Sequence, residues 1–308
     1  MADIVIAEFM DFDAVRDALS GYQTLYDPKL VDEPAALSAA LHDARALIVR
    51  NRVQVRAALL SHAPSLRVVG RLGVGLDNID VDACAARDIA VCPASGANDL
   101  SVAEYVITAA LLLLRRAWFA TTDVANGSWP RMTAIGREIS GKQLGLIGYG
   151  AIARQTAARA RALGMTIVAH DPYLSTSDAT WRDVVNVSLE RLLETSDVVS
   201  LHVPLTDGTR HLIDAGALAR MKHDAILINA ARGGVVDEAA VAAALRAQRL
   251  GGAALDVFAN EPVSATHGAQ FAGIRNLILT PHIAGVTEES NVRVSHVTVA
   301  NVLKHLTR

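Results

Sequence analysis

The 308-residue sequence contains only two cysteines, Cys84 and Cys92, and they form no Cys-x-x-Cys motif. This count excludes a disulfide framework and a metal site built from cysteine, and we expect no metal. Long hydrophobic runs are also missing, since the longest, Tyr105 to Leu114, spans 10 residues. A membrane-spanning helix needs about 20 apolar residues, so the sequence predicts none.

An excess of one charge is equally absent. The chain has 29 basic and 32 acidic residues, a net charge of −3, which argues against a nucleic-acid partner. The first residues carry Asp3 and Glu8 and have no basic lead, unlike a secretion signal. We therefore expect a cytoplasmic protein without nucleic-acid or membrane partners.

The composition is that of a globular protein, with 51% hydrophobic and 20% charged residues, and the length suggests two domains. Short apolar runs alternate with helix-length segments, which is typical of an α/β fold with parallel sheets. The predicted strands are Ile4–Ala7, Ala46–Val49, Arg67–Val69, Ala90–Cys92, Leu144–Ile147, Thr166–His170, Asp197–Val203, Ala225–Asn229, Ala253–Val257 and Asn276–Leu279.

Helices are predicted between and after these strands. They include Asp13–Ser20, Pro34–His42, Leu100 to about Trp118, Ala151–Leu163, Asp237–Gln248 and Glu288–Thr307. Asp237 is a suitable N-cap for its helix, and Gly251 follows the end of that helix.

A glycine turn joins the strand Leu144–Ile147 to the next helix. Gly148 permits the tight turn, Gly150 lets the backbone approach a pyrophosphate, and Ala153 supplies the small third residue. Asp171 follows the next strand, 171 − 150 = 21 residues after Gly150, where a carboxylate accepts hydrogen bonds from an adenosine ribose. Its charge would repel a 2′-phosphate, so the pattern indicates NAD rather than NADP.

Three polar segments follow later strands, at the edge where open α/β sheets bind ligands. Arg232 can hold a carboxylate in a bidentate fork. His282 can exchange a proton with a hydroxyl, and Glu261, 282 − 261 = 21 residues earlier, can fix its tautomer and stabilise its charged form. Taken singly, each could equally be a structural or solvated residue, and the sequence alone does not prove their pairing.

Together these segments resemble the D-isomer-specific 2-hydroxyacid dehydrogenases along the whole chain. The motifs are Asn-Ala-Ala-Arg232-Gly-Gly, Asn-Glu261-Pro and Thr-Pro-His282-Ile-Ala-Gly. The resemblance implies a Rossmann-type NAD-binding domain, 99–283, inserted in a flavodoxin-like α/β substrate domain, 1–98, to which the C-terminal helix 284–308 returns. It also implies hydride transfer between the nicotinamide and C2 of a D-configured 2-hydroxy or 2-keto acid, with catalytic Arg232, Glu261 and His282.

The resemblance further assigns binding residues. For NAD they are Gly148, Tyr149, Gly150, Ala151, Ile152, Asp171, His202, Pro204, Thr209, Ala230, Ala231, Asp256 and Gly285. For the small anionic substrate they are Asn51, Arg52, Val74, Gly75, Asn98, Arg232 and His282. The loop around Trp129 helps form the dimer in this family, so we expect a homodimer.

The sequence leaves several substrates open. Arg50, Asn51 and Arg52 follow a strand and could bind a negative group on C3 such as a sulfonate or phosphate, or be only a solvated basic loop. This loop and the N-terminal strand are similar to sulfolactate dehydrogenases of the family, which suggests (S)-3-sulfolactate and 3-sulfopyruvate. The alternatives are 3-phosphoglycerate, glycerate or hydroxypyruvate, an NAD-sensing regulator, and a structural oligomer with a vestigial site.

Overall fold

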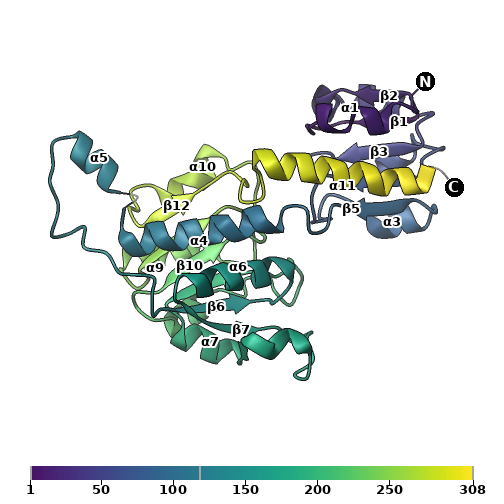
Figure 1. Cartoon of the computed structure of the whole chain (residues 1–308). Helices are drawn as coiled ribbons and strands as arrows, with labels where there is room; N and C mark the ends of the chain where they lie inside the picture. The colour runs from purple at the N-terminus through teal and green to yellow at the C-terminus, as the bar shows by residue number, and fades with distance from the viewer. Residues whose placement is uncertain (1, 118, 307–308) are drawn as a thin grey trace. The chain divides into compact units, whose positions relative to one another are not determined.

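The computed structural model describes residues 2–117 and 119–306, which fold into two compact units. Unit 1 comprises 1–98 with 286–308, and unit 2 comprises 99–285. Both are built on parallel sheets covered by helices, which confirms the predicted α/β class (Figure 1).

Unit 1 contains a five-stranded sheet in the order β2-β1-β3-β4-β5, the flavodoxin-like order. Its strands are β1 (Ile4–Ile6), β2 (Thr24–Tyr26), β3 (Ala46–Val49), β4 (Val68–Arg71) and β5 (Ala90–Pro93). Its helices are η1 (Asp13–Val15), η2 (Asp17–Leu19), η3 (Pro28–Asp32), α1 (Pro34–Ala40), α2 (Ala57–Leu60), α3 (Val81–Ala85) and α11 (Glu288–Leu306).

The last helix, α11, packs on the middle of this sheet although it is the most distant segment in sequence (Figure 1). Gly70 on β4 makes this possible, since a Cβ there would lie 2.6 Å from Val302 and 2.9 Å from Thr298. Arg45 extends from the start of β3 and donates to the Leu306 carbonyl at 2.6 Å. The C-terminal helix therefore completes the core of unit 1.

Unit 2 contains a seven-stranded sheet in the order β12-β11-β10-β9-β6-β7-β8, the doubly wound order of a Rossmann fold. Its strands are β6 (Gln143–Ile147), β7 (Thr166–His170), β8 (Val185–Asn186), β9 (Val198–Leu201), β10 (Ile226–Asn229), β11 (Gly252–Leu255) and β12 (Leu277–Leu279). Its helices are α4 (Asp99–Arg115), α5 (Ala120–Ala125), α6 (Ala151–Ala162), η4 (Ala179–Asp183), α7 (Leu189–Thr195), α8 (Ala215–Arg220), α9 (Glu238–Arg246), α10 (Ala265–Gly268) and η5 (Ala269–Phe271).

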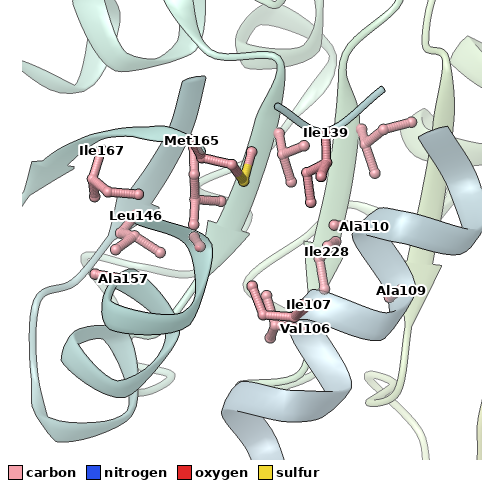
Figure 2. Packing of buried hydrophobic residues seen from close by; sticks show 14 of the residues in the cluster. Val106, Ile107, Ala109, Ala110, Ile139, Leu146, Ala157, Met165, Ile167 and Ile228 are labelled. Atoms are coloured by element: carbon pink, nitrogen blue, oxygen red, sulfur yellow. The ribbon is translucent and has the colours of Figure 1, made fainter. Parts of the chain in front are cut away.

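One face of the unit 2 sheet is covered by α4 and α6, which pack against each other. Val106, Ile107 and Ala110 of α4 are buried in the same cluster as Leu146 of β6 and Ile228 of β10 (Figure 2). This near-continuous apolar surface, rather than intrinsic helix propensity, stabilises α4 and fixes the sheet beneath it.

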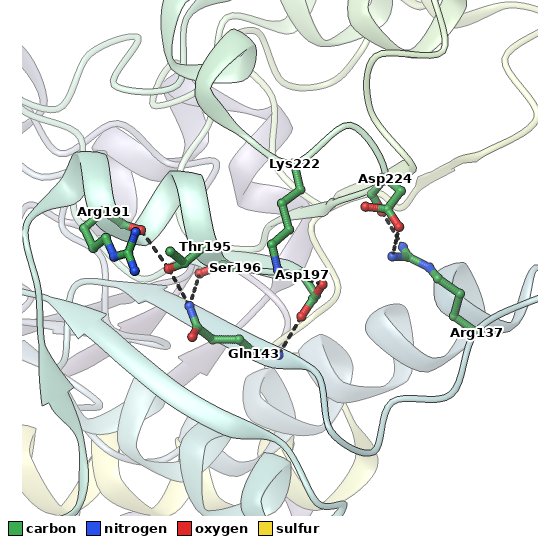
Figure 3. A network of polar contacts seen from close by, with 8 residues as sticks. All are labelled: Arg137, Gln143, Arg191, Thr195, Ser196, Asp197, Lys222 and Asp224. Carbon is green, nitrogen blue, oxygen red and sulfur yellow. Dashed lines mark hydrogen bonds and ion pairs between the residues drawn. The ribbon is translucent and has the colours of Figure 1, made fainter.

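A polar network ties the amino ends of the central strands β6 and β9 (Figure 3). Asp197 accepts from the Gln143 N–H at 2.8 Å and pairs with Lys222 at 3.1 Å. Burial alone would raise the pKa of Asp197, but these hydrogen bonds and the charge of Lys222 lower it overall. The network fixes the β6–β9 register at the edge opposite the glycine turn.

Several sequence predictions need correction. The predicted helix Asp13–Ser20 is two short 3₁₀ turns, η1 and η2, and the short strands β2 and β8 were not anticipated. Asp237 does cap α9, but the turn after α9 uses Gln248 with a φ of 55°, not Gly251. The predicted helix ends at Trp118 and Thr307 lie outside the described residues, and the observed helices are described to Arg115 and Leu306.

Candidate active site

The glycine turn lies at the carboxyl end of β6, beside β9, where the strand order of the sheet reverses. Gly148 has a φ of 85°, and a Cβ there would lie 2.6 Å from the His202 carbonyl oxygen, so no other residue fits. Gly150 begins α6, and an added Cβ would have nothing within 4 Å. No side chain of the described residues caps α6, so its N-terminal N–H groups suit a pyrophosphate.

Asp171 follows β7 and lies against this turn. Its Oδ2 accepts from the Tyr149 N–H at 2.9 Å, and its Oδ1 accepts from the Tyr173 N–H at 3.0 Å. Of the other turn residues, Ala151 is exposed, Ile152 is half-buried and Ala153 is fully buried. The structure thus joins the predicted ribose acceptor directly to the predicted phosphate-binding turn.

The segment after β9 continues this edge of the sheet. Burial lowers the pKa of His202 to about 4, so its ring is neutral at physiological pH. Its Nε2 lies 3.0 Å from the Ser200 hydroxyl. Thr209 donates to the Pro204 carbonyl at 2.6 Å and thereby shapes the turn that follows.

The loop that carries Arg232 follows β10 and is braced by Asn229, which is 1% exposed. The Asn229 amide donates to the Arg232 carbonyl at 2.9 Å, and its oxygen accepts from the Ala231 N–H at 3.1 Å. Arg232 itself donates to the Ala231 carbonyl at 2.5 Å. The sequence predicted no role for Asn229, although an amide side chain at the end of an apolar strand could have suggested one.

Asp256, after β11, holds the loop that carries His282. Its Oδ1 accepts from the Thr280 hydroxyl at 2.6 Å and the Ile283 N–H at 2.8 Å, and its Oδ2 accepts from the Ala284 N–H at 2.8 Å. Burial raises the pKa of Asp256 despite these hydrogen bonds. Its observed contacts are therefore to this loop, and the nicotinamide contact that the family resemblance implies stays a prediction.

His282 and Glu261 meet in this structure, with His282 Nδ1 2.8 Å from Glu261 Oε2. His282 has a φ of 58°, which the N–H bond to the Asp256 carbonyl at 2.8 Å helps to hold. Burial would raise the pKa of Glu261, but hydrogen bonds from His282 and Phe258, with the charges of His282 and Arg232, lower it overall. The structure thus joins Glu261 to His282 by a hydrogen bond, and the charge of Arg232 also acts on Glu261.

Tyr105 of α4 extends this network. Its hydroxyl lies 2.6 Å from the Thr280 hydroxyl, which donates to Asp256. Burial raises the pKa of Tyr105 to about 12, so the phenol stays protonated. The residue stood in an apolar run that predicted only packing, so sequence reasoning missed its polar role.

Unit 1 presents its own loops at the carboxyl edge of its sheet. Glu8, which is 4% exposed, follows β1 and accepts hydrogen bonds from four consecutive backbone N–H groups after β3. These are the N–H groups of Arg50, Asn51, Arg52 and Val53, at 2.8 to 3.2 Å. Because the carboxylate occupies these donors, only the side chains of this loop remain for a ligand.

The arginines of that loop differ in their surroundings. Arg52 is exposed and pairs with Asp32, which raises the pKa of Arg52. Arg50 donates to Asn291 Oδ1 at 3.0 Å, and burial lowers its pKa despite the charge of Glu8. The sequence predicted Asn51 and Arg52 as ligands, and this stays a prediction. Within residues 2–117 and 119–306, the Arg50 guanidinium donates to the Phe9 carbonyl and to Asn291 Oδ1 and to no carboxylate.

The loop after β4 wraps around its own arginine. Arg71 is buried, and it donates to the Gly75 carbonyl at 2.9 Å and the Leu72 carbonyl at 2.5 Å. The predicted ligand Val74 is 39% exposed at the tip of this loop. Asn98 is the last residue of the first segment of unit 1. Its Oδ1 is buried with no hydrogen-bond partner in the part of the chain that the structure describes.

Over residues 2–117 and 119–306, no group of three or more histidine, cysteine, aspartate or glutamate side chains is arranged to hold a metal ion. In the same residues, no helix combines the length and apolar character that a membrane crossing requires.

Comparison with known proteins agrees with this geometry. Residues 107–284 match the family model for the NAD-binding domain of D-isomer specific 2-hydroxyacid dehydrogenases. An (S)-sulfolactate dehydrogenase from Chromohalobacter salexigens is 54% identical over 307 residues, covering 99% of both chains. A D-3-phosphoglycerate dehydrogenase from Archaeoglobus fulgidus is 39% identical over 84% of this chain, which spans about half (49%) of that relative.

Among solved structures, D-lactate dehydrogenase from Aquifex aeolicus, complexed with NAD and lactic acid, superposes with a TM-score of 0.83. It is 28% identical, and the match covers 98% of this chain and 95% of the other. The glycine turn, the strand order and the family model agree on the cofactor, and the relatives agree on the reaction class. The chain belongs to the D-isomer-specific 2-hydroxyacid dehydrogenase family and is an NAD-dependent enzyme that transfers a hydride between the nicotinamide and C2 of a 2-hydroxy or 2-keto acid.

Proposed function

We propose that the enzyme interconverts (S)-3-sulfolactate and 3-sulfopyruvate. The observation that carries this proposal is the 54% identity to an (S)-sulfolactate dehydrogenase over 99% of both chains, unit 1 included. Stereochemistry is compatible, because a CH₂-sulfonate outranks carboxylate in naming priority. The spatial arrangement called R in lactate is therefore called S in sulfolactate.

Proton transfer is assigned to His282. Because Glu261 engages Nδ1, Nε2 is the nitrogen that accepts the hydroxyl proton in oxidation or returns it in reduction. Glu261 orients the ring and stabilises its charged form. Arg232 polarises the C2 oxygen and helps to anchor the C1 carboxylate.

NAD fits the turn at Gly148 and Gly150, since the open space at Gly150 and the uncapped start of α6 suit a pyrophosphate. Asp171 accepts the ribose hydroxyls through lone pairs that its two backbone contacts leave available. When bound, the nicotinamide supplies the hydride acceptor or donor. We also propose that the remaining residues predicted to bind NAD, from His202 to Gly285, contact the cofactor.

We assign most contacts to the substrate anions to unit 1. The backbone N–H groups of Val74 and Gly75 hold the C1 carboxylate, in a loop that the Arg71 guanidinium braces through the Gly75 carbonyl. Arg50 binds the sulfonate, with Asn51 and Arg52 beside it, because its partial burial strengthens an ionic contact. The unpartnered Asn98 oxygen suits a donor from a ligand. Unit 1 is then the substrate domain and unit 2 the NAD domain.

Initial-rate kinetics with NAD on sulfolactate, 3-phosphoglycerate, D-glycerate and D-lactate test this proposal. We expect kcat/KM for sulfolactate to exceed that for D-lactate by about 10- to 150-fold, the value of one charged hydrogen bond. Equal turnover of lactate would remove the case for a sulfonate site. Preference for 3-phosphoglycerate would favour the activity of the Archaeoglobus fulgidus relative instead.

We further propose that the enzyme is a homodimer, working in the cytoplasm. The segment around α5 stands out from the rest of unit 2 (Figure 1) and exposes Val124, Trp129, Met132 and Ile135, with Trp129 at 78%. Such an apolar patch is typical of an interface. Light scattering should give a dimer for the wild type and a monomer for Trp129→Asp with Met132→Asp. A wild-type monomer at micromolar concentration would refute the dimer.

A further inference from the structure

The loop that carries Glu261 is held by an acid outside the proposed catalytic trio. Glu238 is the first residue of α9 and is 7% exposed. Its Oε1 accepts from the Ala259 N–H at 2.6 Å. This bond fixes the peptide that joins Phe258 to Ala259, at the start of the Glu261 loop.

A histidine fixes the orientation of that acid. His267 in α10 places Nε2 2.6 Å from Glu238 Oε2, so both carboxylate oxygens have a partner. The His267 ring packs edge-on against Phe271, with 6.4 Å between centroids, and Phe271 packs against Phe258 at 6.1 Å. Because these aromatic rings are buried or half-buried, the pair has little freedom to move.

The same peptide lies directly against the Arg232 loop. A Cβ on Gly233 would lie 1.9 Å from the Phe258 carbonyl carbon and oxygen and 2.5 Å from the Ala259 nitrogen. The preceding peptide belongs to the same residue, and its Phe258 N–H donates to Glu261 Oε1 at 2.9 Å. Phe258 therefore contacts the neighbour of Arg232 through its carbonyl and positions Glu261 through its N–H.

We propose that Glu238 and His267 are a positioning pair that sets Glu261, and through it His282, relative to Arg232. This inference rests on the catalytic roles proposed above. Without the Ala259 bond the peptide can shift away from Gly233, and Glu261 shifts with it. Catalysis depends on placement within about 0.5 Å, so the pair acts on kcat without touching substrate or cofactor.

Glu238→Ala and Glu238→Gln test the pair by steady-state kinetics. For Glu238→Ala we expect kcat to fall about 10- to 100-fold, with KM for NAD within about twofold. Glu238→Gln should restore most of kcat, because its amide oxygen still accepts from the Ala259 N–H. Unchanged kcat in Glu238→Ala, or no recovery in Glu238→Gln, would overturn the inference.

A double-mutant cycle with Glu261→Gln separates positioning from general structural damage. If Glu238 acts through Glu261, adding Glu238→Ala to Glu261→Gln should change kcat by less than about twofold. Losses that multiply would refute positioning. Full activity of Glu261→Gln alone would instead refute the catalytic role proposed for Glu261, a result distinct from any failure at Glu238.

His267→Ala provides a second variant should Glu238→Ala fail to fold. It leaves the Ala259 bond in place and removes the partner of Oε2, together with the His267 contacts to Gln270 and Phe271, so we expect a smaller loss of kcat, about 3- to 10-fold. Its loss should also disappear in the Glu261→Gln background. A His267→Ala enzyme with wild-type kcat would exclude His267 from the pair.

Discussion

The loop after β3 in unit 1 and the start of α6 in unit 2, each at the carboxyl edge of its sheet, use their backbone N–H groups in opposite ways. In unit 1, Glu8 takes up all four N–H groups of residues 50–53. In unit 2, no described side chain caps α6, and Gly150 has open space beside it. The loop after β3 has its backbone N–H groups filled by the protein itself, and the start of α6 keeps its N–H groups for a ligand.

This difference separates two ways to recognise an anion. Backbone N–H groups at a helix N-terminus bind phosphate with little dependence on side chains, which suits a cofactor that is common to a whole enzyme family. A loop whose N–H groups are already filled must use side chains, here Arg50 and Asn51, and side chains are easily exchanged. The comparison therefore predicts that changes in unit 2 act on the reaction and that changes in unit 1 act on substrate choice.

The largest expected effect lies in unit 2. His282→Asn removes the proton acceptor, and kcat should fall about 100- to 10,000-fold with any substrate. NAD affinity, measured by fluorescence titration, should stay within about twofold because the turn at Gly148 is unchanged. A His282→Asn enzyme with wild-type kcat would show that the proton leaves by another route.

Substituting Glu8, the acid that accepts from the N–H groups of residues 50–53, tests the unit 1 side of the comparison. Glu8→Gln places an amide NH₂ against backbone donors, and unsatisfied buried groups cost about 1–3 kcal/mol each. We expect KM for sulfolactate to rise about 10- to 100-fold with kcat reduced far less, and the denaturation midpoint to fall. Glu8→Asp is the matched control that keeps the charge and shortens the reach. A change in kcat alone would contradict the assignment of Glu8 to substrate choice.

Two arginines of the same loop sharpen the comparison. Arg50→Met should lower kcat/KM for sulfolactate about tenfold and leave D-lactate nearly unchanged, since only sulfolactate carries the second anion. Arg52→Met should have little effect, because Arg52 is exposed and pairs with Asp32. The reverse ranking would move the sulfonate contact to Arg52, as the sequence first suggested.

The smallest effect concerns stability and pH in unit 2. His202 has a folded pKa of about 4, below the unfolded value near 6.5, so the unfolded chain binds more protons between these values. Stability should therefore fall as pH drops from about 6.5 to about 4. Urea unfolding of His202→Gln across this range should give a shallower decline than wild type. Identical slopes would mean that His202 is not buried in its neutral form.

Sequence reasoning found the buried strands that alternate with helices. Buried strands such as β6, β9 and β10 are apolar on both faces and flanked by helices, so period and composition were sufficient. β2 and β8 were missed because they are short, and β8 exposes both Val185 and Asn186 at a sheet edge. The predicted helix at Asp13–Ser20 buries only Val15 and Leu19, too little to extend beyond single turns.

The site was predictable only where its residues stood in family motifs. Arg232, Glu261 and His282 each followed a strand, and in the structure His282 contacts Glu261, whose pKa the charge of Arg232 helps to lower. Glu8 and Glu238 were not found, because their partners are backbone N–H groups 42 to 45 and 21 residues away. A backbone donor has no sequence signature, so such contacts appear only in three dimensions.

The discontinuity of unit 1 has a consequence for biosynthesis. Unit 2 is a continuous segment and can fold once residue 285 has left the ribosome. Unit 1 must wait for α11, which packs on β4 and receives the Arg45 bond. During translation, the first sheet to be made is thus the last to be completed, and its apolar face must be kept from misassociation until the final helix arrives.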